Sequence, residues 1–284
     1  MPGIFLLGAI GIALLTLQWF RVHQTKKKNP VPLSGDLSRG PGQSLLQQID
    51  EVNDALQVCF FGLGSVPAFI FAAHLSCSYF GRAPETWPRV VLSAVSALAF
   101  AGYYLSKLLH LLADRNRLRS GYEGQVAVGQ ELNRLTAEGY RVFHDFPAED
   151  FKIGHIVVGP TGIMVVETIM RSRGRNCNDD KEAVVVYNGR MLHFPKFSDY
   201  EIIDRAKSHA EWLSEWLSLQ VGQDICARAM VAVPGWTVKR ISADGISVVN
   251  PGQFPKLFRY MRPRPISEDL MEHIVRLIKD RSGR

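Results

Sequence analysis

The sequence predicts an α/β fold, with a mixed sheet flanked by helices, preceded by transmembrane helices. Residues 1–112 contain three apolar runs that are long enough to span a membrane. Residues 113–284 alternate short β-branched runs with amphipathic helical patterns. Within this second part, residues 151–169 form two apolar runs around the turn sequence Pro-Thr-Gly, which is typical of two paired strands. The chain therefore divides into a membrane region and an α/β domain.

Charge and cysteine content exclude several classes of function. The 284 residues carry a formal net charge of +6. The positive charge is divided equally between the two parts of the chain. Residues 1–112 have 8 cations and 5 anions, and residues 113–284 have 25 cations and 22 anions, which gives +3 in each part. No long basic stripe is present, so charge alone predicts only weak, salt-sensitive attraction to phosphate. The four cysteines show no CxxC spacing, which argues against a zinc site and a disulfide framework.

The first apolar run, residues 4–20, predicts an uncleaved membrane anchor. Its length is close to the lower limit for spanning, which is roughly 17 to 25 residues. A signal peptide would have basic residues before the run, whereas here the cations follow it, at Arg21 and at the three lysines of residues 26–28. Because positive residues stay inside, we expect the N-terminus outside and these lysines in the cytoplasm.

The second and third apolar runs, residues 58–80 and 90–112, predict a membrane hairpin, because only a short loop separates them. Cations follow the third run directly, at Arg115, Arg117 and Arg119. Three spans from an outside N-terminus place residues 113–284 in the cytoplasm. We therefore expect an integral membrane protein of the bacterial inner-membrane type with a cytoplasmic C-terminal domain.

The cytoplasmic part begins with the signals of a helix and then of strands. Apolar residues at helical spacing predict a helix over residues 124–138, and Gly139 is a typical stop. Strands are expected at residues 140–146, 151–159 and 163–169.

The second half of this part predicts a hairpin and two more helices. Asn188-Gly189 is a strong signal for a two-residue β-hairpin turn. The spacing from Ser198 to Glu201 is that of a capping box, which predicts the start of a long helix reaching about Leu219. Two strands at residues 227–233 and 246–249 and a terminal helix at residues 266–279 complete the expected domain.

One acidic residue lies near the end of a predicted central strand. Strand alternation puts Glu167 on the same face as Val165 and Ile169. On the preceding strand, the corresponding face carries Lys152 and Gly154. A carboxylate on a buried strand is costly unless another group holds it. The ordinary alternative is a strand end that emerges into solvent.

Four sequence blocks together resemble the nuclease-related domain family, NERD. The blocks are GYEGQVAVGQELNRL, GYRVFHDFP, FKIGHIVVGPTGIMVVET and AKSHAEWL. The resemblance extends over about residues 121–252. It implies a fold similar to the PD-(D/E)xK nuclease core, that is, a restriction-endonuclease-like mixed sheet flanked by helices.

The resemblance also implies a set of catalytic positions. Family members usually carry a glutamate on the first helix, an aspartate before the histidine of the first central strand, Glu-x-Lys on the next strand and a glutamine on the following helix. Such a site uses Mg²⁺ or Mn²⁺ to polarise the phosphate and to activate water, and the lysine assists the nucleophile.

Most of these positions are substituted in this chain. Gln125 replaces the helix glutamate, Gly154 the aspartate, Ile169 the lysine and Arg205 the glutamine, and only Glu167 is retained. A single carboxylate is a poor site for Mg²⁺. We therefore expect no cofactor, either metal or small molecule, and Mg²⁺ or Mn²⁺ bound at Glu167 only if the nuclease site is functional.

Three functions are compatible with these residues. The domain can be a catalytically impaired nuclease relative that binds DNA, RNA or a protein partner, with phosphate contacts from Lys152, Arg171, Arg173, Arg175 and Arg205. It can be an active nuclease whose site is rebuilt from neighbouring acids at Glu123, Asp145, Glu149 or Asp150. It can also be a non-catalytic membrane scaffold. A steep salt dependence of DNA affinity distinguishes nucleic-acid binding from binding to a protein partner.

Overall fold

The computed structural model describes residues 39–80, 87–171, 183–261 and 266–283. The chain divides into two compact units, which are described separately below. The first unit includes Ile49–Asn116, and the second combines Asp36–Gln48 with Arg117–Arg284. The predicted first span at residues 4–20, together with Arg173 and Arg175, lies outside the described residues.

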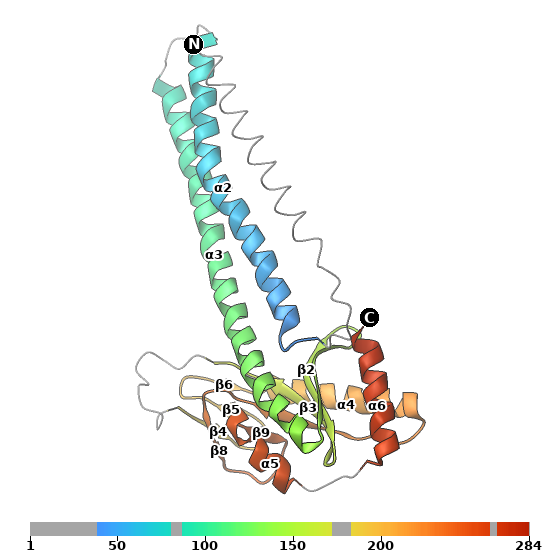
Figure 1. The fold of residues 1–284 in the computed structure, drawn as a ribbon. Coiled ribbons are helices and arrows are strands. Elements are labelled where there is room, and N and C mark those ends of the chain that lie inside the picture. Colours follow the sequence, from blue (N-terminus) through green and yellow to red (C-terminus); the bar gives the residue numbers. More distant parts are fainter. Residues whose placement is uncertain (1–38, 81–86, 172–182, 262–265, 284) are drawn as a thin grey trace. The chain divides into compact units, whose positions relative to one another are not determined.

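Two long helices, α2 (Gln43–Phe80) and α3 (Trp87–Asn133), supply the described part of the first unit (Figure 1). By length and composition, both are apolar enough to cross a membrane. Their most apolar windows have mean hydropathies of 1.8 and 1.4 and are almost entirely unburied. The described residues therefore contain two helices that could span a membrane, where the sequence predicted three spans in the whole chain.

The two helices pack closely at one glycine. A Cβ atom built on Gly62 would lie 2.4 Å from the Tyr104 ring, so only glycine admits this ring. Leu56, Cys59 and Leu108 form a small buried cluster between the same helices. This packing agrees with the predicted helical hairpin.

The helix boundaries differ from those predicted. The predicted spans at residues 58–80 and 90–112 are parts of longer helices, and the predicted separate helix at 124–138 is the end of α3 followed by the short 3₁₀ helix η1 (Arg134–Glu138). Good helix formers continue beyond the hydropathy change at residue 112, so α3 does not end there. Gly139 ends the helical stretch with a φ of 88°, as expected.

The second unit contains two mixed sheets rather than the one predicted. The larger has the order β1-β2-β3-β7-β9, with antiparallel pairing through β3 and parallel pairing beyond it. Its strands are β1 (Arg141–Pro147), β2 (Lys152–Gly159), β3 (Gly162–Thr168), β7 (Ala227–Ala232) and β9 (Ser247–Val249). The smaller sheet has the order β6-β5-β4-β8, with strands β4 (Val184–Tyr187), β5 (Leu192–His193), β6 (Ser198–Asp199) and β8 (Thr237–Arg240).

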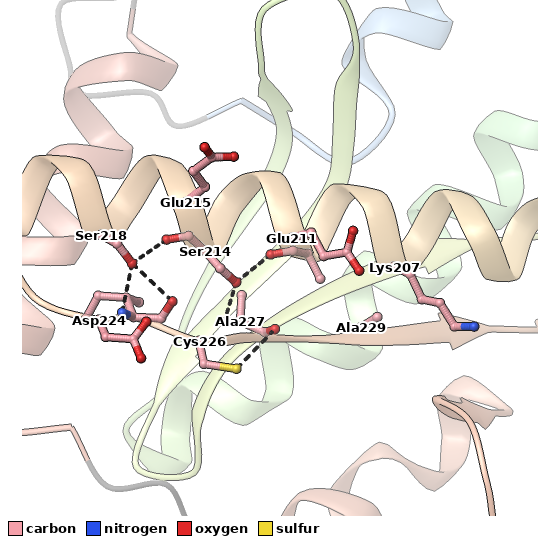
Figure 2. A pocket seen from close by; sticks show the side chains of 11 residues that line it. Lys207, Glu211, Ser214, Glu215, Ser218, Asp224, Cys226, Ala227 and Ala229 are labelled. Atoms are coloured by element: carbon pink, nitrogen blue, oxygen red, sulfur yellow. Dashed lines mark hydrogen bonds between the residues drawn. The ribbon is translucent and has the colours of Figure 1, made fainter.

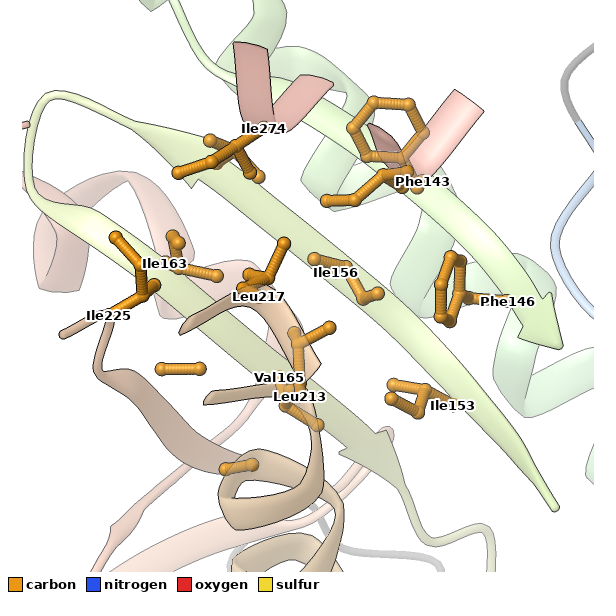
Figure 3. Packing of buried hydrophobic residues seen from close by; sticks show 14 residues of the cluster. Phe143, Phe146, Ile153, Ile156, Ile163, Val165, Leu213, Leu217, Ile225 and Ile274 are labelled. Atoms are coloured by element: carbon orange, nitrogen blue, oxygen red, sulfur yellow. The ribbon is translucent and has the colours of Figure 1, made fainter. Parts of the chain in front are cut away.

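Helices cover both faces of the larger sheet. Helix α4 (Glu201–Val221) and helix α6 (Glu268–Ser282) pack on one face, where Ile156 and Val165 of the sheet meet Leu213 of α4 (Figure 3). The other face packs against the end of α3 and against α5 (Phe254–Tyr260), which follows the short 3₁₀ helix η2 (Pro251–Gln253). This layered arrangement confirms the predicted α/β class.

The start of α4 also differs from the prediction. Ser198 belongs to β6 and its hydroxyl pairs with His193 Nδ1 at 2.8 Å, so it does not cap the helix. The N-cap residue is Tyr200, and the side chain of Asp199 accepts a hydrogen bond from Ile202 N at 3.3 Å. The strand pairing of β6 takes the serine away from the helix end.

An arginine fastens α6 to α4. The rings of Trp212 and Trp216 are parallel within 2°, with centroids 6.0 Å apart. The guanidinium of Arg281 lies 5.2 Å from both centroids, and its Nε donates to the Pro147 carbonyl at 3.1 Å. Cation–π attraction and a hydrogen bond thus act on the last turn of α6.

We predict that Arg281→Ala loosens α6 by about 1 kcal/mol, because it removes the cation–π contacts and the bond to β1. Hydrogen exchange of α6 amides in the full chain in lipid nanodiscs should then be roughly fivefold faster. Arg276→Ala, on an exposed position of the same helix, is the matched control and should leave exchange unchanged. Equal exchange in both variants would contradict this role of Arg281.

Candidate functional site

The structure brings three of the family positions together. Gly154 of β2 donates its backbone N–H to Glu167 Oε1 of β3 at 3.3 Å. A Cβ atom built on Gly154 would lie 3.1 and 3.2 Å from the two amide atoms of Gln125, on α3. Three of the positions that the resemblance singled out, Gln125, Gly154 and Glu167, are therefore neighbours here, and only Glu167 is acidic.

Glu167 is held inside the protein rather than at an exposed strand end. Its exposed fraction is 4%. Oε1 accepts a hydrogen bond from His209 Nδ1 at 2.8 Å, and Oε2 lies 3.8 Å from Arg205 Nε. The ring of Phe151 stacks on the His209 imidazole at 4.3 Å and fixes its orientation. The carboxylate is thus paired with two side chains of α4.

His209 was not identified from the sequence. It lies four residues after Arg205, so both side chains project from neighbouring turns of one helix face. The spacing of four residues from Arg205, a position that the resemblance singled out, is the sequence signal that points to His209.

Ile169 replaces the family lysine with an apolar contact. It is buried just beyond the end of β3, and it packs in an apolar cluster with Ile203 and Ala206 of α4. No cation takes the lysine's place on the strand. The charge next to Glu167 comes instead from Arg205 on the helix.

These residues do not fit a divalent metal ion. Within the described ranges, no group of three or more histidine, cysteine or acidic side chains is placed to hold a metal. Gln125 Oε1 is buried without a hydrogen-bond partner, but an amide oxygen is a weak ligand compared with a carboxylate. Since Glu167 is already paired, one neutral oxygen is left where Mg²⁺ would need anionic ligands.

The neighbouring acids do not rebuild the site in this arrangement. Asp145 binds the start of α2, where its carboxylate accepts from Ser44 N at 3.0 Å and from Ser44 Oγ at 2.5 Å. Glu123 pairs with Arg119 at 2.9 Å on the surface of α3. The other two acids, Glu149 and Asp150, are exposed in the turn between β1 and β2.

The cations proposed for phosphate contact differ in availability. Lys152 is exposed at the start of β2. The Arg205 side chain is 52% exposed although it approaches Glu167. Arg171 is engaged, because it pairs with Asp199 at 2.8 Å and lies 5.4 Å above the Phe197 ring. Lys152 and Arg205 are therefore the described cations best placed to meet a ligand.

A buried chain of hydrogen bonds runs beside the family positions. His144 Nδ1 and His155 Nδ1 are 2.8 Å apart. His144 Nε2 lies 3.1 Å from Asn133 Oδ1, and His155 Nε2 lies 3.4 Å from Thr168 Oγ1. Burial lowers the pKa of His144 to about 4, and burial together with the neighbouring His144 lowers the pKa of His155 well below its usual value.

One proton arrangement satisfies this whole chain. If Asn133 Oδ1 accepts from His144 Nε2–H, then His144 Nδ1 is free to accept from His155 Nδ1–H. His155 Nε2 then accepts from the Thr168 hydroxyl. Both imidazoles are neutral in this arrangement, which agrees with the lowered pKa values of the two rings.

We predict that acid destabilises the fold through His144. Its pKa is about 6.5 when unfolded and about 4 when folded, so the unfolded chain takes up the proton first. The stability present above pH 6.5 should fall as the pH drops toward 4, by about 3 kcal/mol for this group. Hydrogen exchange of β1 and β2 amides in the full chain measures the loss.

His144→Gln should reduce that pH dependence, because one of the two buried rings that resist protonation is gone while His155 remains. His273→Gln, which removes an exposed histidine of α6, is the matched control and should keep the dependence of the unmodified protein. A flat profile in the unmodified protein between pH 6.5 and 4.5 would contradict the neutral histidine pair.

A separate groove lies along another flank of α4 (Figure 2). It has a volume of about 640 Å³ and includes Lys207, Glu211 and Cys226. Its two serines are used by the fold, because Ser214 Oγ accepts from Ala227 N and Ser218 Oγ accepts from Ile225 N, both at 2.8 Å. Its polar groups therefore connect α4 to the start of β7.

Comparison with known proteins supports the family resemblance. The family model described as nuclease-related domain, NERD, matches residues 120–234. Comparisons with curated proteins and with solved structures gave no match. The matched range includes α4, β1 to β3 and the convergence of Gln125, Gly154 and Glu167. Residues 120–234 of this chain are a nuclease-related, NERD, domain.

Proposed function

We propose that this protein is a membrane-anchored, catalytically inactive relative of nucleases whose NERD domain binds the phosphate backbone of nucleic acid. The observation that carries the proposal is the pairing of Glu167 with His209 and Arg205. The remaining carboxylate of the family set is used to join β3 to α4, so it is not free to bind a metal ion.

The substitutions also change the charge that a phosphate would meet. The family set of three carboxylates and one lysine carries about −2, which suits metal ions. Here Glu167 and Arg205 contribute −1 and +1, and the other positions are neutral. Lys152, exposed nearby on β2, adds a second cation that an anionic ligand could contact.

Membrane anchoring is supported by the surface of α2 and α3. Large apolar side chains are exposed along both helices, for example Phe71 at 63% and Leu98 at 73%. Exposed apolar surface of this extent needs a cover, and a bilayer supplies it. The cations after the apolar runs favour a cytoplasmic NERD domain, where nucleic acid is present.

We predict salt-sensitive binding of duplex DNA by the full chain in lipid nanodiscs, without cleavage in Mg²⁺ or Mn²⁺. Arg205→Gln and Lys152→Gln should each weaken binding and lower the slope of log affinity against log salt by about 1. Lys256→Gln removes an exposed cation of α5, on the other face of the sheet, and should leave both unchanged. Fluorescence anisotropy with labelled duplex DNA, and with RNA in parallel, measures these effects.

Three outcomes would overturn the proposal. Metal-dependent cleavage that disappears in Glu167→Gln would establish an active nuclease. Binding that all three cation variants weaken equally would indicate general charge attraction without a site. Absence of nucleic-acid binding from a folded protein would leave a module for protein contacts at the membrane.

A further inference from the structure

A short N-terminal segment lies directly against the candidate site. We call residues 39–45 the clasp; they comprise the chain before α2 and its first turn, and they belong to the same compact unit as the NERD domain. Gly42 and Ser44 of the clasp are buried. The segment is thus packed on the domain rather than extended into solvent.

Asp145 holds the clasp by its charge. Its carboxylate accepts from both the backbone and the hydroxyl of Ser44, in the first turn of α2, and lies 4.0 Å from the Arg39 guanidinium. Free N–H groups at a helix start favour such a carboxylate. Asp145 also has a φ of 50°, which is unusual for a residue other than glycine and is offset by these contacts.

Two glycines allow the clasp to approach α3. A Cβ atom built on Gly129 would lie 2.7 Å from Pro41 Cβ, so no larger residue fits there unless the clasp moves. Gly42 has a φ of +69°, and a Cβ atom on it would lie 3.2 Å from Gln125 Cβ. The clasp therefore covers the side of Gln125, next to Gly154.

We propose that the clasp is an autoinhibitory strap, which competes with the phosphate backbone of nucleic acid for the α3 side of the site. This inference rests on the function proposed above. With the clasp bound, Gln125 is covered on the side that faces Gly42, whereas Lys152 and Arg205 are exposed. Opening the clasp exposes the α3 side, and nucleic acid can then span both helices.

The expected change in DNA affinity depends on the fraction of time for which the clasp is open. The apparent Kd of a site that is accessible for a fraction of the time is the intrinsic Kd divided by that fraction. A clasp that is open for about one tenth of the time would weaken binding about tenfold.

Two variants should open the clasp by different means. Asp145→Asn removes the charge that holds Ser44 and Arg39. Gly129→Ala adds a methyl group that collides with Pro41, changes no charge and favours the helix by roughly 1 kcal/mol. Gly102→Ala makes the same change in the same helix where nothing lies within 4 Å of the new atom, and is the matched control.

Two measurements are made on each variant, with the full chain in lipid nanodiscs. Hydrogen exchange of amides 43–48 reports opening of the clasp, and anisotropy with labelled duplex DNA reports affinity. We expect faster exchange and a Kd tightened about threefold to tenfold in Asp145→Asn and Gly129→Ala, with no change in Gly102→Ala. Because Gly129→Ala is neutral, tighter binding in that variant cannot come from a lost negative charge.

The other outcomes separate the two proposals. Faster exchange with unchanged DNA affinity would overturn the autoinhibitory role of the clasp and leave the proposed nucleic-acid binding intact. Unchanged exchange in both variants would overturn it as well, because these contacts would not hold the clasp. Faster exchange in the variants, with no DNA binding by the unmodified protein or by any variant, would overturn both the proposed function and the autoinhibitory role of the clasp.

Discussion

The pairing of Glu167 with His209 and Arg205 is the interaction on which this account depends. A carboxylate that is 4% exposed in the middle of a domain needs partners, and a nuclease supplies a metal ion for this purpose. Here two side chains of α4 take that place, with the imidazole nitrogen at 2.8 Å. The same pairing connects α4 to β3, so Glu167 contributes to the fold as well as to the charge of the surrounding surface.

Two glycines near this pair allow close contacts with α3 and with the segment before α2. Gly154 leaves room for the Gln125 amide, and its backbone N–H, rather than a carboxylate, faces Glu167. Gly129 leaves room for Pro41, which lets the segment before α2 lie on the domain. The approach of Gln125 to β2 and the approach of the clasp to α3 thus both depend on glycines. The candidate site and the clasp therefore pack against neighbouring parts of α3, at Gln125 and at Gly129.

Sequence reasoning predicted the parts that depend on local patterns. The strands expected at residues 151–159 and 163–169 correspond to β2 and β3, because β-branched residues around a Pro-Thr-Gly turn are a strong signal. The resemblance also indicated which positions would meet around Gly154. It could not show His209 as the partner of Glu167, 42 positions away, or Ser44 as the partner of Asp145, 101 positions away. The hydropathy change at residue 112 predicts the end of a helix, whereas α3 continues without a break to Asn133, because hydropathy alone does not end a helix.

The most direct test of the paired carboxylate is Mn²⁺ binding to the full chain, followed by electron paramagnetic resonance. We predict no Mn²⁺ site that depends on Glu167, so the unmodified protein and Glu167→Gln should leave the same amount of free Mn²⁺. A variant carrying Gly154→Asp and Ile169→Lys restores the family pattern at two positions and is the positive comparison. Binding of Mn²⁺ by the unmodified protein that is lost in Glu167→Gln would contradict the account and indicate a functional nuclease site.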